Sequence, residues 1–164
     1  VIKEFLRKHP EFKLSVSCTT RAPREGEVDG VNYFFLSKDE FQRRINNGDF
    51  LEWAEFSGNM YGTGKDYVEK TLNAGHDLIL EIDTKGALNV KSIMPEAKLI
   101  FILPPSMEEL ESRLRGRKTE SEEAIQKRLA STKLEIENSK NFDYKIVNDS
   151  IEQALNDLEK ILMN

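Results

Sequence analysis

Cysteine is nearly absent from this chain of 164 residues, because Cys18 is the only one. A single thiol forms neither an internal disulfide bond nor a cysteine-based metal site, and such scarcity is typical of the reducing cytoplasm. Histidine is almost as rare, and His9 and His76 are too isolated in the sequence to suggest a metal site or a catalytic pair. We therefore expect a cytoplasmic protein without disulfides.

Long apolar runs are also missing. No stretch approaches the roughly 20 residues that a membrane-spanning helix requires, and no signal-peptide pattern opens the chain. The formal net charge of −5 argues against broad binding to nucleic acid or to a membrane surface, since both need an extended basic face. An anionic ligand would need arginines clustered locally.

The phosphate-binding motif GxxxxGK[ST] does not occur in the sequence. The nearest approach is the segment 61–65, but Asp66 follows its lysine and Asn59 occupies the earlier glycine position. The chain opens on Val1, and its apolar spacing predicts a helix over 1–8 that no preceding residue caps. We expect the chain to be the remainder of a longer polypeptide, with a strand and loop before this helix.

Strand and helix signals alternate along the chain. Four short apolar segments predict buried strands: Phe12–Ser17, Leu78–Ile82, Lys98–Leu103 and Tyr144–Val147. Capping-box patterns predict helix starts at Ser37-x-x-Glu40, Ser106-x-x-Glu109, Thr119-x-x-Glu122 and Ser150-x-x-Gln153. This alternation predicts an α/β fold with a parallel core sheet, and the glycine- and aromatic-rich region 17–77 reads as an inserted subdomain.

The segment Ser15–Glu27 combines small hydroxyl side chains with Arg21 and Arg24, and Tyr33 follows closely. Guanidinium groups match phosphate oxygens in pairs, while hydroxyl and phenol groups add further donors. The segment therefore predicts a site for a phosphate monoester. The same composition suits a solvated turn, and the two interpretations are equally supported by the segment alone.

Acidic side chains occur at two positions where burial would be costly. Glu52 stands between apolar residues, where a base edge with paired N–H groups would satisfy it, although a half-exposed strand glutamate is the commoner case. Glu81 and Asp83 are two residues apart and are expected to face one side of a strand near its carboxyl end. Acidic groups there suit a sugar hydroxyl or a hydrated magnesium ion, and otherwise are loop-edge carboxylates.

Basic residues gather at 113–119, around Gly116, and Arg128 follows on the next expected helix. Arginines beside a helix break can neutralise the charge that develops in phosphoryl transfer. Arginine-rich helix ends are also ordinary solvated surface. The segment alone favours the solvated surface.

Taken together, the sequence resembles the guanylate kinase family over essentially its whole length. The matching stretches, in the family's order, are SVSCTTRAPREGEVDGVNYFF, FLEWAEFSGNMYGTGK, ILEIDTKGA, FILPPSMEELESRLRGRKTES and IVND. The resemblance implies the nucleoside monophosphate kinase fold, an α/β fold with a parallel core sheet. It divides the chain into a core (1–16, 78–112 and 129–164), a GMP-binding subdomain with a mixed or antiparallel sheet (17–77) and a helical lid (113–128).

The resemblance implies transfer of the ATP γ-phosphate to GMP, giving ADP and GDP, with Mg²⁺ accompanying ATP. It assigns the GMP phosphate to Ser17, Arg21, Arg24, Tyr33 and Tyr61, and guanine to Glu52 and Thr63. Glu81 and Asp83 would lie near GMP, with Asp83 reaching the metal only through water. The remaining assignments are the catalytic group Arg21, Arg113, Arg117, Arg128 and Asp83, and the ATP-binding group Arg113, Arg117 and Asn148.

The chain departs from the family in its missing phosphate loop, which in guanylate kinases directly precedes the helix that begins here at Val1. Without that loop the ATP phosphates lose their cradle, so GMP binding is expected to outlast catalysis. A guanylate-kinase-like module that binds a phosphopeptide is one alternative, and a kinase for AMP or a pyrimidine nucleotide is another. Glu52, Asp83 and the lid arginines weigh against the first, and Glu52 with Thr63 against the second.

Overall fold

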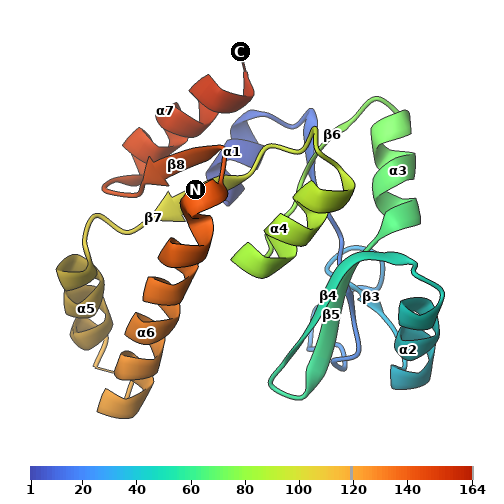
Figure 1. Ribbon diagram of the computed structural model, residues 1–164, viewed down its shortest axis with the longest axis horizontal. Coiled ribbons are helices and arrows are strands. Elements are labelled where there is room, and N and C mark those ends of the chain that lie inside the picture. The colour runs from blue at the N-terminus through green and yellow to red at the C-terminus, as the bar shows by residue number, and fades with distance from the viewer. Residues whose placement is uncertain (119, 164) are drawn as a thin grey trace. The chain divides into compact units, whose positions relative to one another are not determined.

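The computed structural model describes residues 1–118 and 120–163, which form a mixed α/β protein (Figure 1). The chain divides into two compact units, one made of Val1–Lys8 with Glu96–Asn164 and the other of His9–Pro95. Among the described residues no helix is long and apolar enough to cross a membrane. The three-part division expected from the sequence stays a prediction.

The unit His9–Pro95 contains two sheets. Strands β1 (Phe12–Leu14) and β6 (Asp77–Ile79) pair in parallel, as expected for the first two apolar segments. The second sheet is mixed, with strand order β3-β2-β5-β4, parallel pairing between β2 and β3 and antiparallel pairing elsewhere. Its strands are β2 (Cys18–Thr19), β3 (Phe34–Phe35), β4 (Phe50–Phe56) and β5 (Asn59–Gly64).

Three helices complete this unit: α2 (Lys38–Asn46), α3 (Lys65–Asn73) and α4 (Thr84–Ile93). Helix α2 places Phe41 against Phe50 of β4, with the ring centroids 4.5 Å apart, and both rings pack with Cys18 in a buried cluster. Helix α4 contacts β4. This packing holds one face of the mixed sheet in place and brings the start of α4 to it.

The unit Val1–Lys8 with Glu96–Asn164 is built on the parallel pair β7 (Ile100–Leu103) and β8 (Tyr144–Val147). Helix α1 (Ile2–Lys8) buries Phe5 and packs against α7 (Ile151–Leu162), which also contacts β8. Helices α5 (Met107–Gly116) and α6 (Glu122–Asn138) lie side by side (Figure 1), and a 3-10 turn (Ser139–Asn141) follows α6.

Three of the four predicted helix starts are confirmed, each with its predicted serine as N-cap. The side chains of Ser37, Ser106 and Ser150 each accept a hydrogen bond from the backbone amide three residues later. The fourth prediction is wrong, because α6 begins at Glu122 and its N-cap is Ser121, whose hydroxyl accepts from the Ala124 amide at 3.1 Å. Thr119 lies outside the described residues.

The predicted helix at the start of the chain is confirmed as α1. All four predicted strands are present, but the prediction that they are buried is wrong, because Ile146 is the only fully buried residue in the strands as the structure describes them. Strand β1 ends at Leu14 and β6 at Ile79. Glu81 and Asp83 therefore do not face one side of a strand, and that prediction is wrong. The physical reason is that Asp83 is the N-cap of α4, so the chain leaves the sheet before it reaches either carboxylate.

Candidate functional site

Arg21 follows β2 and is held by the carboxylate of Glu27. The guanidinium donates from Nη1 to Oε1 at 2.9 Å and from Nη2 to Oε2 at 3.0 Å. The backbone amide of Arg24 donates to the same Oε1 at 2.7 Å. The Arg21 side chain and then the Arg24 amide lower the pKa of Glu27 to about 2, so this carboxylate is ionised throughout the physiological range.

Two phenols complete the surroundings of Arg21. Its guanidinium carbon lies 5.2 Å from the ring centroid of Tyr33, and the rings of Tyr33 and Tyr61 are 6.1 Å apart. The hydrogen-bonded carboxylate of Glu27 raises the pKa of the guanidinium, with smaller contributions from the nearby side chains of Tyr33 and Tyr61. Three of the residues predicted to hold a phosphate therefore come together.

The hydrogen bonds of Arg21 leave one edge of its guanidinium plane for other partners. Nη1 donates to Glu27 and to the carbonyl of Ala22, and Nη2 donates once to Glu27, which uses three of the five N–H groups. The remaining two, on Nε and Nη2, lie on one edge. That edge is available to the phenols and matches two oxygens of a phosphate group.

Glu52 and Thr63 face each other across β4 and β5. Thr63 is fully buried and donates from Oγ1 to Glu52 Oε1 at 2.8 Å. Glu52 is half-buried, and this burial raises the pKa of its carboxyl, with a smaller contribution from the charge of Asp83. The two residues predicted to bind guanine thus form one unit, a half-buried carboxylate whose Oε1 already accepts a hydrogen bond from Thr63.

Strand β5 links these two clusters. Tyr61 and Thr63 are two residues apart in that strand, so both side chains lie on the same face of the sheet. Tyr61 pairs with Thr19 of β2, near Arg21, whereas Thr63 pairs with Glu52. An anion-binding group and a carboxylate acceptor therefore lie on one surface.

Asp83 and Glu81 adjoin this surface from the chain after β6. Asp83 Oδ1 accepts from the Gly86 amide at 2.7 Å. Glu81 is exposed and lines a pocket of about 150 Å³. The other residues that line this pocket are Leu14, Ser15, Ser17, Asn32, Tyr33, Leu80 and Ile82. Ser17 thus shares this pocket with Tyr33, while Arg24 is exposed to solvent.

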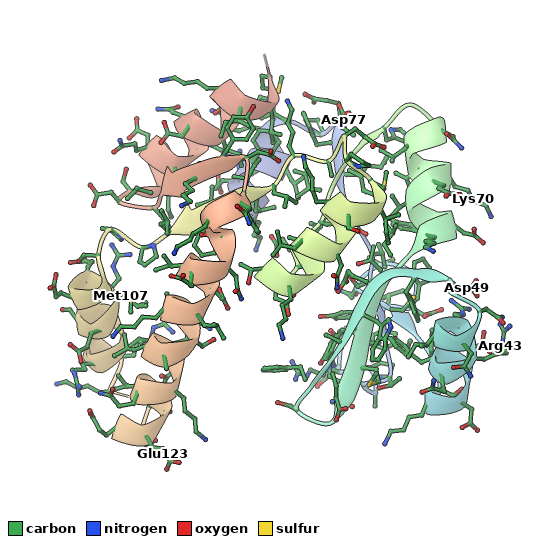
Figure 2. All side chains as sticks on the ribbon, viewed as in Figure 1. Arg43, Asp49, Lys70, Asp77, Met107 and Glu123 are labelled. Carbon is green, nitrogen blue, oxygen red and sulfur yellow. The ribbon has the colours of Figure 1, made fainter. Side chains whose placement is uncertain are left out.

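The remaining predicted residues belong to the unit that contains α5 and α6. Arg113 donates from Nε to Glu109 at 3.2 Å, Arg117 is the C-cap of α5, and Arg128 is exposed on α6. Asn148 directly follows β8, and its amide donates to the Leu103 carbonyl at 2.7 Å. Figure 2 shows the side chains of this helix pair, with Met107 labelled on α5 and Glu123 on α6.

Sequence reasoning missed three residues whose contacts shape these clusters. Glu27 holds Arg21, and the signal for it was an opposite charge six residues away in a turn-rich segment. Arg115 joins α5 to α6 through an ion pair with Glu122 at 2.5 Å, and it also pairs within α5 with Glu111 at 3.2 Å. Gly86 lies against Glu52, a proximity that only the fold reveals.

The chain matches the family model for guanylate kinase over residues 1–164. It is 51% identical over 160 residues to a guanylate kinase from a Synechococcus strain, covering 98% of this chain and 84% of that protein. A guanylate kinase from Desulfitobacterium hafniense is also 51% identical, over 161 residues, covering 98% of this chain and 80% of the relative.

A solved structure agrees with these relatives. The crystal structure of guanylate kinase from Anaplasma phagocytophilum superimposes with a TM-score of 0.75 at 36% sequence identity, covering 99% of this chain and 78% of that one. The match spans both units of the chain. By its sequence and by its fold, the chain belongs to the guanylate kinase family.

Proposed function

We propose that this chain transfers the γ-phosphate of ATP to GMP, giving ADP and GDP, and that the mixed sheet of the unit His9–Pro95 binds GMP. The observation that carries the proposal is the joint placement of the Arg21 cluster and the Glu52–Thr63 pair along β5. One surface thereby offers an anion-binding end and a carboxylate end, as a nucleoside monophosphate requires.

The carboxylate end suits guanine. Guanine presents N1–H and an exocyclic amine to an acceptor such as Glu52, whereas adenine has neither donor at those positions. A half-buried carboxylate left without a donor costs free energy, so AMP would bind much more weakly. Thr63 donates a hydrogen bond to Oε1 of Glu52 from the neighbouring strand and so orients the carboxylate.

The phosphate end suits a monoester dianion. In the proposal, the available edge of Arg21 and the phenols of Tyr33 and Tyr61 donate hydrogen bonds to the phosphate oxygens. Ser17 and Arg24, on either side of Arg21 in the sequence, add further donors. Glu27 keeps Arg21 in place without using that edge. Each donor to an ionised oxygen is worth about 1.5–3 kcal/mol.

The reaction itself needs positioning and charge stabilisation. In the proposal, an oxygen of the GMP phosphate attacks the γ-phosphorus in line, and the bond to the ADP oxygen breaks, with no covalent enzyme intermediate. Arg113, Arg117 and Arg128 would stabilise the transferring group, and Asn148 would lie at the adenine pocket. In the nucleoside monophosphate kinase fold that the proposal implies, the parallel strands belong to a core sheet. Residues 17–77 form an inserted GMP-binding subdomain, and residues 113–128 form a lid that excludes water.

Magnesium accompanies ATP in this proposal. The described residues contain no group of three or more His, Cys, Asp and Glu side chains that could hold a metal ion by themselves. Mg²⁺ readily takes its ligands from phosphate oxygens and water together with one or two carboxylates. The exposed Asp83 fits contact through a metal-bound water, and the ion would neutralise the phosphate charge during transfer.

Calorimetric titration of the full chain with GMP and, separately, with a phosphoserine peptide tests the proposal. We expect saturable GMP binding and no measurable peptide binding, because a peptide lacks the adjacent, coplanar N–H donors with which guanine would match Glu52. Peptide binding that exceeds GMP binding would instead favour a phosphopeptide-binding module and would overturn the assignment.

A further inference from the structure

Gly86 lies unusually close to the carboxylate of Glu52. A Cβ atom placed on Gly86 would stand 2.8 Å from Glu52 Oε2, 3.3 Å from Glu52 Cδ and 3.0 Å from Asp83 Oδ1. The first of these distances is shorter than the contact that a real methyl group tolerates. What glycine provides at this position is therefore space and not a special backbone conformation, since α4 has ordinary helical geometry here.

The carboxylate of Glu52 is confined from two directions. Thr63 donates to Oε1 from β5, and the first turn of α4 bounds Oε2 at Gly86. Asp83 is itself fixed, because its Oδ1 accepts from the Gly86 amide. With two sides occupied by protein, Glu52 keeps acceptor capacity on its half-exposed side, where the proposed function places guanine.

We propose that Gly86 is a positioning residue that sets base selectivity, because the missing side chain leaves the space in which Glu52 is held for guanine. This inference rests on the proposed function, in which Glu52 accepts from guanine. Gly86 does not touch the nucleotide in this account. It acts through the position of Glu52.

Replacing Gly86 with alanine would move Glu52 without unfolding the unit. The atoms that a new Cβ meets at 2.8 and 3.0 Å are the ends of two side chains, and neither is backbone. Side-chain ends rotate away more cheaply than backbone shifts, and alanine favours a helix more than glycine does. Because the Glu52 oxygen is the nearer of the two, the substitution mainly changes the direction of the Glu52 carboxylate, and Asp83 has to move less.

The test compares Gly86→Ala with Gly64→Ala by calorimetric titration of the full chain with GMP and with AMP. Gly64 is a matched control, because its φ and ψ are −73° and 132° and a Cβ there would meet only Tyr67 Cβ, at 3.9 Å. We expect Gly86→Ala to weaken GMP binding about tenfold or more and to leave AMP binding unchanged, which lowers the selectivity ratio. Gly64→Ala should leave both affinities unchanged.

A double-substitution cycle separates positioning from general damage. In the Glu52→Ala background, Gly86→Ala should have no further effect on GMP affinity, because the group on which it acts is gone. Thermal unfolding of Gly86→Ala should show one transition near that of the wild type. A second loss of affinity in the Glu52→Ala background would overturn the inference.

The same measurements distinguish this inference from the proposed function. If Glu52→Ala leaves GMP affinity unchanged, the assignment of Glu52 to guanine fails, and the inference fails with it. If Glu52→Ala weakens GMP binding while Gly86→Ala does not, the assignment of Glu52 stands and only the role of Gly86 is overturned.

Discussion

The pair Arg21–Glu27 shows how a single acidic residue can organise an anion site. Glu27 repels a phosphate electrostatically, yet it aligns the guanidinium through two hydrogen bonds of 2.9 and 3.0 Å. A carboxylate that occupies one edge of an arginine leaves the other edge oriented for the ligand. We expect alignment to outweigh repulsion.

Glu27→Gln tests that balance. The glutamine side chain keeps one acceptor oxygen but loses the charge and the second hydrogen bond to Arg21. The Arg21 side chain therefore gains conformational freedom, which it must lose again when GMP binds. We expect GMP affinity to fall about tenfold in a calorimetric titration, with no change for Glu25→Gln, which alters an exposed carboxylate of the same turn. Tighter GMP binding by Glu27→Gln would mean that Glu27 competes with the phosphate.

The half-buried carboxylate of Glu52, which is proposed to bind guanine, is expected to lower the stability of the folded protein. Burial raises the pKa of its carboxyl in the folded state, so the folded protein loses stability as the pH rises through that raised pKa. Glutamine does not titrate. Glu52→Gln should therefore raise the free energy of unfolding at about pH 7, and by much less at about pH 4, below the unfolded-state pKa of about 4.3.

Urea unfolding of the wild type and of Glu52→Gln at both pH values checks this prediction. The Thr63 hydroxyl can still donate to the glutamine oxygen, so the comparison isolates the charge. An equal gain at the two pH values would show that burial of the charge is not the cause.

At the scale of the element, local signals located the helices well. Ser37, Ser106 and Ser150 cap their helices as the capping-box pattern predicts, because that signal depends only on residues three apart. The pattern failed at α6, where two candidate caps stand two residues apart and Ser121 caps the helix. The error at Glu81 and Asp83 has a similar cause, since a strand and a helix cap compete for the same residues.

The start of α6 offers a prediction with a control in the same helix. Ser121→Ala removes the side chain that accepts from the Ala124 amide at 3.1 Å, so it should lower the free energy of unfolding by about 1 kcal/mol. Ser131→Ala, at an exposed interior position of α6, should raise it slightly, because alanine is the better helix former.

Urea unfolding followed by circular dichroism measures both variants. We expect the two serine-to-alanine substitutions to change the free energy of unfolding in opposite directions. If Ser121→Ala is as stable as Ser131→Ala, the N-cap assignment is wrong.

At the scale of the whole molecule, the predicted residues separate between the two units. The residues assigned to GMP, from Ser17 to Asp83, belong to His9–Pro95, whereas Arg113, Arg117, Arg128 and Asn148 belong to the other unit. Residue types and motif order supplied the assignment of each group to GMP or to ATP, and these assignments stay predictions. Pairings such as Arg21 with Glu27 and Glu52 with Gly86 could not be predicted in this way, because they depend on how turns and strands bring side chains together.

In the proposed function, one carboxylate on β4, that of Glu52, makes this chain selective for GMP. The most direct test is the ratio of GMP to AMP dissociation constants, measured by calorimetry for the wild type and for Glu52→Ala. We predict that the wild type prefers GMP by about a hundredfold or more and that Glu52→Ala loses most of this preference through weaker GMP binding. An unchanged ratio in Glu52→Ala would contradict the account.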